Sequence, residues 1–418
     1  MSQAREGPIR AVVAGGGKQL FEQFADPRVQ VLAAGEAAEA DVDLIVVPCG
    51  TPQVLKLSAE ALQPAPFWDQ AARGRALVVF DASAEGRMHA PQRSEALHQL
   101  LRAKGVPAAR AVYLTQERNY RDDYLAHCAG AGQGEPMNVL LHDFWIWRFV
   151  GQFLRTGKVI LGERRTAFKA RPPARERRFM SFNFTPRPTK ALFLLSLMRD
   201  GLWDQGFISF GGFEQFERLH DRDLASFKRM MLRMPGFEDL AAELAPLLPQ
   251  LDAYGQVMLG GVDRGPDGRF LDKSPLLDRK LPQFDQSWFT VVTETEMRAH
   301  RSRITEKPLK PLVNFQPMAV FGNPGALQMI RDLGFSTFGE VIDERYDDEP
   351  DPRRRFDMVY AEVRRLCSLD DAELARLEAS IADKLEANAR WGLMDMPRIR
   401  RAQQDAALID RILALAPA

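Results

Sequence analysis

The chain has 418 residues, more than one ordinary hydrophobic core accommodates, which predicts two domains that each bury a core of their own. Its 56 lysines and arginines balance its 56 aspartates and glutamates, so no global field attracts nucleic acid or an anionic membrane. Cys49, Cys128 and Cys367 are far apart and form no Cys-x-x-Cys pair, which argues against a disulfide framework and favours a reducing cytoplasm.

Neither a signal peptide nor a membrane span is expected. The first ten residues, MSQAREGPIR, lack an apolar core, and no window approaches the roughly 20 uninterrupted apolar residues that a span needs. We therefore expect a cytoplasmic protein without a transmembrane segment. Peripheral contact with the inner face of the membrane stays open.

The first part of the chain alternates short apolar runs with helix-like stretches. The runs are Ile9–Gly15, Val42–Gly50, Arg75–Ser83 and Ala109–Gln116. Runs of this kind, separated by roughly 25 to 35 residues of helix-like sequence, are typical of βαβ units around a parallel sheet. The sequence therefore predicts a doubly wound, Rossmann-type α/β domain over residues 1–161.

Three glycines, Gly15 to Gly17, follow the first run without forming a dinucleotide-binding fingerprint. Leu20 stands where that fingerprint requires a small residue, and the second run ends in Pro-Cys-Gly where an acidic residue is needed. The pattern argues against an NAD-dependent oxidoreductase. It is consistent with a glycine-rich turn beside a ligand.

Residues 162–178, GERRTAFKARPPARERR, predict a basic linker. The segment is dense in arginine, contains Pro172-Pro173 and shows no periodicity. The simplest interpretation is a solvated linker. Its charge density leaves contact with anionic lipid headgroups open.

A second α/β domain is predicted over residues 179–352. The strand-like FMSFNF is followed by TKALFLLSLMRDGL, in which apolar residues recur at helical spacing. Further strands are expected at FISFGG, WFTVVTET and PMAVFG. The remaining expectations are a long helical region at 221–251, a surface loop at 263–286 and C-terminal helices at 353–418, interrupted near Trp391-Gly392 and Pro397.

Two doubly wound domains that face a cleft, followed by a helical C-terminal tail, describe the GT-B architecture of nucleotide-sugar glycosyltransferases. They also describe periplasmic-type binding proteins and several isomerases. Architecture alone therefore does not choose among these classes.

Thr305-Glu306-Lys307 is the segment that points to a ligand. It follows a predicted strand, and open α/β sheets bind ligands in the loops beyond their strands. Lys307 and Lys310 supply positive charge beside a helix expected over residues 308–315, and Glu306 offers acceptors for sugar or ribose hydroxyls. This combination suits a sugar linked to a diphosphate. The alternative is a carboxylate that stabilises its own helix beside two solvated lysines.

The surroundings of this triplet resemble those in the α-1,3-fucosyltransferases and their bacterial and viral relatives. In that family a strand ends in Phe-Glu-Asn, and after a loop come Tyr-hydrophobic-Thr-Glu-Lys, a helix and an apolar strand ending at Gly. The corresponding segments here are Thr293-Glu294-Thr295, Arg303-Ile304-Thr305-Glu306-Lys307 and PMAVFGNPG. Upstream, FMSFNFTPRPTKALF is similar to the family's strand, Ser-Asn, proline and helix-initial arginine. The resemblance covers about residues 178–345 of the printed sequence.

The resemblance implies a site for a nucleotide-sugar donor in the second domain. Its diphosphate would be held by Lys307 and Lys190, with Arg187 one turn away, and Glu306 would hold the ribose. Glu294 would act next to the transferred sugar. The remaining members of the implied donor set are Asn183, at the strand end, Arg303 and Thr305.

Three departures from the family pattern leave the base and the sugar undecided. Arg303 replaces the tyrosine that packs on guanine, and Lys190 replaces an arginine whose fork grips phosphate bidentately. The loop between Glu294 and Thr305 is also longer than in the family.

No metal or other cofactor is expected. The acidic residues Asp343, Glu344, Asp347 and Asp348 are interpreted as a solvated loop, and the six histidines show no paired spacing. GT-B enzymes hold the diphosphate with protein cations and helix N-termini.

An inverting transferase needs a base, which the N-terminal domain would supply. Asp81 and Glu85 follow one predicted strand, and Glu117 follows the next. We favour Glu85, since the fucosyltransferases too use a carboxylate from this domain. A retaining reaction would not require it.

A second candidate for acceptor binding is the segment LLHDFWIWRF, which contains His142, Asp143, Trp145 and Trp147. Aromatic faces stack on sugar rings, so this cluster predicts an acceptor platform. For the two tryptophans core packing is the preferred interpretation, since they lie at alternating positions in an apolar run.

The sequence as a whole predicts a glycosyltransferase that moves a sugar from a nucleotide-diphosphate sugar to a hydroxyl of a glycan or glycolipid acceptor. We expect inverting, metal-independent transfer in surface-glycan assembly, with no nucleic-acid partner. The competing hypothesis is a non-catalytic sugar- or nucleotide-binding protein of the same two-domain type, which has no need of Glu85 or Glu117.

Overall fold

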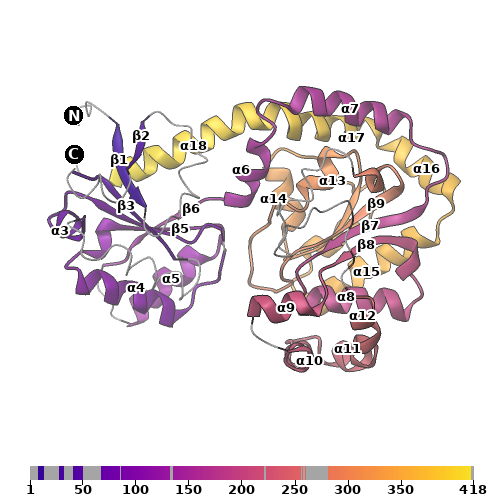
Figure 1. The fold of residues 1–418 in the computed structure, drawn as a ribbon, viewed down its shortest axis with the longest axis horizontal. Helices are drawn as coiled ribbons and strands as arrows, with labels where there is room; N and C mark the ends of the chain where they lie inside the picture. The colour runs from indigo at the N-terminus through magenta and orange to yellow at the C-terminus, as the bar shows by residue number, and fades with distance from the viewer. Residues whose placement is uncertain are drawn as a thin grey trace, which may run out of the picture. The chain divides into compact units, whose positions relative to one another are not determined.

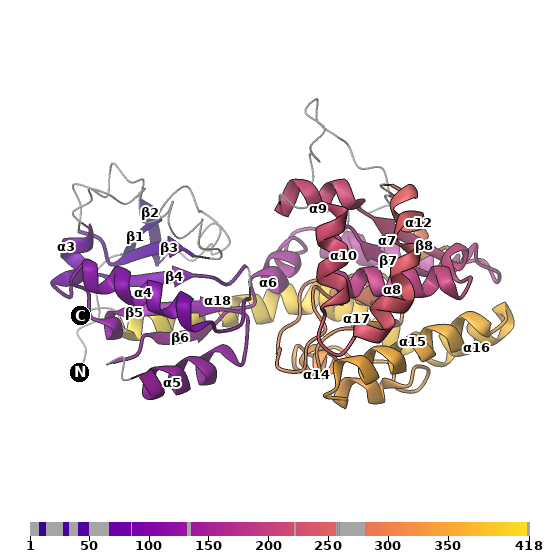
Figure 2. The ribbon, with the colours of Figure 1, turned by 90° about the horizontal axis from the view of Figure 1, so that it is seen from below.

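A computed structural model describes residues 8–13, 28–32, 41–49, 67–84, 86–131, 135–220, 223–255, 257, 259 and 281–415. The chain divides into two compact units (Figures 1 and 2). Unit 1 comprises Met1–Gln152 and Met396–Ala418, and unit 2 comprises Phe153–Asp395. The C-terminal residues therefore belong to the same unit as the N-terminal ones.

Unit 1 contains a six-stranded, all-parallel sheet in the order β2-β1-β3-β4-β5-β6. The strands are β1 (Ile9–Val13), β2 (Val29–Leu32), β3 (Leu44–Pro48), β4 (Leu77–Asp81), β5 (Ala111–Thr115) and β6 (Asn138–Leu141). The central strands are continuously apolar because both faces of the sheet are covered.

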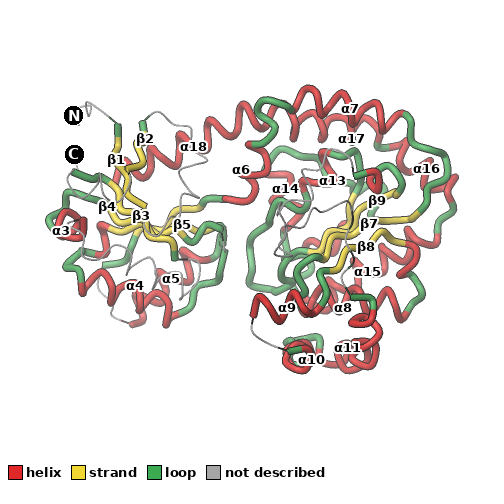
Figure 3. The backbone as a smooth tube through the Cα atoms, viewed as in Figure 1, coloured by secondary structure: helices red, strands yellow, loops and turns green. Residues whose placement is uncertain are grey.

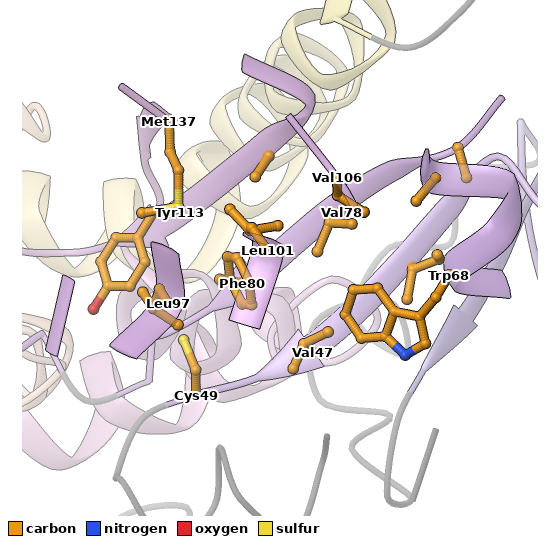
Figure 4. Close-up of a cluster of buried hydrophobic side chains, with 14 of the residues drawn as sticks. Val47, Cys49, Trp68, Val78, Phe80, Leu97, Leu101, Val106, Tyr113 and Met137 are labelled. Carbon is orange, nitrogen blue, oxygen red and sulfur yellow. The ribbon is translucent and has the colours of Figure 1, made fainter. Parts of the chain in front are cut away.

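The two faces of this sheet are covered by different parts of the chain. Ile45 and Val47 point to a core shared with α3 (Phe67–Ala72), α4 (Pro91–Ala103) and α5 (Tyr120–Ala131), part of which is drawn in Figure 4. Leu44 and Val46 point the other way, since side chains alternate along a strand. Their core includes Leu408, Ile409 and Ile412 of α18 (Met396–Leu415).

Unit 2 contains a four-stranded, all-parallel sheet in the order β10-β9-β7-β8, of which Figure 3 labels β9, β7 and β8. The strands are β7 (Arg177–Asn183), β8 (Gly206–Phe210), β9 (Ser287–Thr293) and β10 (Met318–Phe321). The helices between the strands are α8 (Pro188–Arg199), α9 (Phe213–His220), α10 (Leu224–Leu232), α11 (Glu238–Leu244), α12 (Leu248–Ala253) and α13 (Leu309–Val313). After β10 come α14 (Ala326–Asp332), α15 (Pro352–Ser368), α16 (Asp371–Ser380), α17 (Ala382–Arg390) and a π-helical turn at Trp391–Asp395.

Two parallel α/β units followed by a helical C-terminal region confirm the predicted α/β fold class. The predicted facing of the two units across a cleft stays a prediction. All four apolar runs of the N-terminal part form strands, namely β1, β3, β4 and β5, whereas β2 and β6 were not predicted. The glycine-rich turn and most of the predicted loop at 263–286 lie outside the described residues.

The prediction that residues 162–178 form an aperiodic linker is wrong in its first half. Residues from Gly157 to Lys169 form the helix α7, which buries Ile160 and Leu161. Charged side chains obscure this pattern in the sequence, because long arginine stems pack along a protein surface while their charged ends find partners. One such partner is Glu386, which forms an ion pair with Arg165.

The rest of this basic segment is neutralised within unit 2. Arg171 donates to Asp285, to Glu378 and to the carbonyl oxygens of Phe315 and Asn314. Arg175, whose side chain is 1% exposed, also pairs with Glu378. The predicted solvated linker is therefore wrong for these two arginines, and neither guanidinium is presented to a lipid surface.

The long helical region predicted at 221–251 is divided into α10, α11 and α12. Gly236, with φ of 79°, lies between the first two of these helices. None of the helices in the described part of the chain is both long and apolar enough to cross a membrane.

Candidate active site

The strand order of unit 2 creates a topological switch point between β7 and β9, the place where open α/β sheets have a crevice. From β7 the chain moves to β8 on one side, and later it moves from β9 to β10 on the other. Right-handed crossovers then place α8 and α13 on opposite faces of the sheet, as Figure 1 shows. In open α/β sheets ligands bind at such a switch point, beyond the carboxyl ends of the strands. The loops after β7 and β9 carry the predicted donor residues.

Asn183 joins the two strands that border this crevice. It is fully buried at the end of β7, where its Oδ1 accepts a hydrogen bond of 2.7 Å from Thr293 Oγ1 on β9. Its Nδ2 donates to Ser181 Oγ at 3.0 Å. These bonds make Asn183 a support for the crevice, and direct contact with a donor stays a prediction.

Glu294 is the first residue beyond β9 and is only 4% exposed. Its Oε1 accepts hydrogen bonds from the backbone N–H of Thr305 at 3.1 Å and from Thr305 Oγ1 at 3.0 Å. Its Oε2 pairs with Lys307 Nζ at 3.4 Å. The carboxylate therefore holds the Thr-Glu-Lys segment against the end of β9.

Glu306 and Lys310 form a second ion pair in the same segment. Lys310 Nζ lies 3.2 Å from Glu306 Oε1, one helical turn away. Burial raises the pKa of Glu306, but the nearby Lys310 and Lys307 ammonium groups outweigh it and hold that pKa below its usual value. Glu306 is therefore an ionised acceptor, as a role in binding ribose hydroxyls requires.

Lys190 is the least satisfied charge in the crevice. It lies in the first turn of α8 and is 5% exposed, yet no described residue accepts a hydrogen bond or forms an ion pair with its ammonium group. Burial lowers its pKa well below the usual value, and the charges of Lys307, Arg187 and Lys310 lower it further, against the opposing effect of Glu294. An anion placed beside Lys190 would relieve this cost.

Counting the charges shows an excess of cations. Lys190, Arg187, Lys307 and Lys310 all act on the same point, and of the two carboxylates nearby Glu294 pairs with Lys307 and Glu306 with Lys310. Lys190 is left without a counter-charge among the described residues. This balance suits a diphosphate. Lys310 is missing from the predicted donor set, although its place four residues after Glu306 signalled the contact.

The helix termini contribute unequally to this charge balance. The predicted helix over residues 308–315 is shorter than expected, since α13 spans only Leu309–Val313. By contrast α8 has 12 residues, begins with Pro188 and has no side chain capping its N-terminus. Its first N–H groups are therefore suited to an anion beside Lys190.

The remaining predicted donor residues lie at the edges of the crevice. Arg187 occupies the N-cap position of α8. Arg303 is buried, and its carbonyl oxygen accepts a hydrogen bond of 3.4 Å from Asn323 Nδ2. The place of a nucleotide base relative to Arg303 stays a prediction.

The acidic residues after α14 are occupied within the fold. Asp347 accepts from the backbone N–H groups of Leu327 and Gln328 at the start of α14, at 2.9 and 3.1 Å. Glu344 accepts from Thr337 Oγ1 at 2.8 Å, and Asp343 pairs with Arg345. Among the described residues, no group of three or more His, Cys, Asp or Glu side chains is arranged to hold a metal ion. The predicted solvated loop is therefore wrong for Asp347, which is buried.

The predicted acceptor residues gather along the carboxyl edge of the unit 1 sheet. Asp81 ends β4, Glu117 follows β5 and Asp143 follows β6, and these three strands are neighbours. Trp145, on α6 (Phe144–Gly151), donates from its indole nitrogen to Ala84 O at 2.7 Å, which joins the loop after β4 to α6. The favoured base, Glu85, lies outside the described residues.

The three described carboxylates of this edge differ in their surroundings. Asp81 accepts hydrogen bonds from the backbone N–H and hydroxyl of Ser83, at 3.0 and 2.6 Å, and burial raises its pKa. Asp143 is held in a two-pronged ion pair by Arg118, at 2.9 and 3.2 Å. Glu117 is fully buried. Asp81, with its raised pKa, is the one best suited to accept a proton.

The two tryptophans of α6 have separate surroundings. Trp147 is buried, in agreement with the core-packing alternative, whereas Trp145 is half-buried beside the guanidinium of Arg148, 5.8 Å from its ring centre. Because the segment is helical, residues two apart point in different directions. The acceptor platform stays a prediction for Trp145 alone.

No family model and no curated protein matches the chain. Among solved structures, an α,α-trehalose 6-phosphate synthase from Burkholderia multivorans is a distant neighbour. It has 13% sequence identity and a TM-score of 0.38, over 90% of this chain and 74% of that chain. A likeness this remote does not extend to substrates or to the roles of residues.

Proposed function

We propose that the chain is a glycosyltransferase whose donor, a nucleotide-diphosphate sugar, binds in the β7–β9 crevice of unit 2. The observation that carries the proposal is the buried Lys190, which has no partner among the described residues and lies close to Lys307, Lys310 and Arg187. A buried ammonium group without a described counter-charge, close to further cations at a switch point, favours a ligand with negatively charged phosphates. Protein cations would neutralise the leaving diphosphate, so the proposed reaction needs no metal.

The acceptor, a hydroxyl of a glycan or glycolipid, is assigned to unit 1 in this proposal. Inverting transfer requires a base there, and Asp81, Glu85 and Glu117 are the candidates. Asp81 is favoured among the described carboxylates because burial raises its pKa, which strengthens it as a base. Assembly of surface glycans at the cytoplasmic side of a membrane is the proposed setting.

The contacts of Glu294 support a second candidate, a nucleotide-sugar-binding protein without turnover. Both carboxylate oxygens of Glu294 are engaged by Thr305 and Lys307. A side chain held in this way positions the donor loop and does not require chemistry at the sugar.

The first test is a thermal-shift titration with GDP, UDP, TDP, CDP and CMP, each with and without EDTA. We expect one nucleoside diphosphate to raise the melting temperature. The rise should persist in EDTA, and the same nucleotide should not stabilise the Glu306→Ala variant. Stabilisation by none of them would overturn the donor site.

Turnover is tested separately by the release of nucleoside diphosphate from the matching nucleotide sugar. The transferase is supported if the nucleotide sugar binds and releases nucleoside diphosphate slowly, and if the rate of release falls in Asp81→Asn or Glu85→Gln. Binding without any release, with and without a panel of glycan acceptors, favours the binding protein.

A further inference from the structure

Unit 1 contains a group of buried polar side chains whose hydrogen-bonding capacity is not fully used by the described residues. Arg93 lies in the first turn of α4, Tyr113 is the middle residue of β5, and Tyr120 is the first residue of α5. Arg93 and Tyr120 belong to the helices that follow β4 and β5, and Tyr113 lies within β5 itself. The mechanism proposed above uses none of them.

The two tyrosines are completely buried and their rings are stacked, with centres 4.4 Å apart and an interplanar angle of 14°. Neither hydroxyl forms a hydrogen bond of good geometry with a described residue, and the groups close enough to interact with the Tyr113 hydroxyl are Tyr120 and Arg93 themselves. Figure 4 shows the hydroxyl of Tyr113 directed away from the apolar side chains of the cluster. An unsatisfied buried hydroxyl costs roughly 1 to 3 kcal/mol, so two side by side need an explanation.

Arg93 adds an uncompensated charge to the same place. Its Nε is buried without a hydrogen-bond partner, and no described carboxylate forms an ion pair with it. The carboxylate of Asp81, at the end of β4, accepts hydrogen bonds from Ser83. A guanidinium buried in part without an anion is rare, because the charge loses its hydration without compensation.

Electrostatics show that these groups face one another. Burial raises the pKa of the Tyr113 and Tyr120 hydroxyls, and the charge of Arg93 acts on both in the opposite sense. Both hydroxyls are therefore neutral and able to donate. Arg93 also acts on the Cys49 thiol, whose pKa burial raises, and on His89, whose pKa burial lowers.

The backbone adds further donors at this point. The helix α4 has 13 residues, starts with Pro91 and has no capping side chain, so its first N–H groups favour negative charge. A guanidinium, two phenol hydroxyls and a helix N-terminus are all donors. Only a ligand rich in acceptors satisfies such a set.

We propose that Arg93, Tyr113 and Tyr120 form a binding site for an oxyanion, a phosphate or carboxylate group, distinct from the donor crevice of unit 2. Resting on the proposed transferase function, we assign this group to the acceptor, which is then an anionic sugar or a sugar phosphate. The guanidinium would pair with two oxygens of the anion, and the hydroxyls would fix its orientation.

The test is calorimetric titration of the full chain with inorganic phosphate and, in a separate arm, with glucuronate. The protein carries Lys190→Met, which removes the main cation of the unit 2 crevice. We expect binding of one or both anions. Arg93→Ala should weaken binding by about tenfold or more, as expected for a charge-assisted contact. Tyr113→Phe with Tyr120→Phe should weaken it several-fold.

Arg121→Ala is the matched control, since Arg121 is an exposed arginine next to Tyr120, and it should leave the affinity unchanged. Arg93→Gln covers the case in which the alanine variant fails to fold. The proposal is overturned if neither anion binds. It is also overturned if Arg93→Gln and the double variant, Tyr113→Phe with Tyr120→Phe, bind the anions as tightly as the protein without these substitutions. Binding of phosphate alone supports a sugar phosphate as acceptor, and binding of glucuronate alone supports a sugar acid.

The nucleotide titration keeps this proposal separate from the proposed function. Arg93 variants should keep their stabilisation by nucleoside diphosphate, because the donor site lies in unit 2. If anions bind through Arg93 while no nucleotide binds, the oxyanion site stands and the transferase assignment fails.

Discussion

Removing the ammonium group of Lys190 should stabilise the free protein while weakening its binding of ligand. Lys190→Met keeps the length of the side chain and deletes a buried charge that has no partner in the described structure. We expect the free energy of unfolding to rise by about 1 to 3 kcal/mol, the cost of an unsatisfied buried polar group. The two effects of opposite sign distinguish a ligand-binding lysine from a structural one.

The expected loss of binding follows from the contact that is removed. A hydrogen bond to a charged group contributes about 1.5 to 3 kcal/mol, so the Kd of the nucleoside diphosphate should rise about tenfold to 150-fold. Calorimetry measures the affinity, and differential scanning calorimetry without ligand measures the stability. Lys228→Met, at an exposed site on α10, is the control that should change neither.

The pH dependence of stability provides a second measurement on the same variant. The pKa of Lys190 in the folded state is lowered by burial and by Lys307, so the unfolded chain binds more protons. The contribution of Lys190 therefore makes stability rise with pH between its lowered pKa and the ordinary value of about 10.5. Lys190→Met should remove this rise. A variant that is less stable than the wild type and binds nucleotide equally well would refute the reasoning.

Ligand binding should also take up protons when Lys190 meets a phosphate. The anion raises the lowered pKa, so affinity falls as pH rises through that range. Titrations in two buffers of different ionisation enthalpy detect the uptake. Equal apparent enthalpies in both buffers would contradict it.

Three further predictions concern single side chains. Gly157→Ala should destabilise unit 2 by about 1 to 3 kcal/mol or more, measured by chemical denaturation, because its Cβ would lie 1.8 Å from the carbonyl oxygen of Leu393. Thr305→Val should weaken nucleotide binding several-fold in calorimetry, because it removes the hydroxyl that donates to Glu294; unchanged affinity would show that the loop holds its shape without it. Burial lowers the pKa of His142 to about 4, so the free energy of unfolding should fall by about 3 kcal/mol as pH falls from about 6.5 to 4. His142→Gln should flatten this part of the curve of stability against pH.

The strands show how far local sequence determines the fold. Runs such as Leu77–Asp81 are β-branched and apolar, and the structure contains them as central strands of a parallel sheet. The strands β2 and β6 have four residues each, too few for a clear pattern. The helix α7 was missed because arginines with partners far along the chain interrupt its apolar face. Short elements and distant ion pairs are decided by tertiary contacts, which a single sequence does not reveal.

The candidate donor site was predictable in its members but not in their contacts. Resemblance placed Glu294 and Lys307 in one site, and the structure joins them in an ion pair. The lack of a partner for Lys190 among the described residues follows from the arrangement of three separate segments, so no local pattern signals it. The group of Arg93, Tyr113 and Tyr120 was missed for the same reason, since its members are spread over two helices and a strand.

The packing of α18 on the first sheet has a consequence for how the chain folds as it is made. Arg28 pairs with Asp410, 382 positions later, and Leu408 and Ile412 cover strands that are synthesised near the start. Unit 2 is continuous in sequence and can complete its core first. During translation one face of the first sheet then waits uncovered until α18 leaves the ribosome. This interval is when aggregation competes with folding and when a chaperone would be needed most.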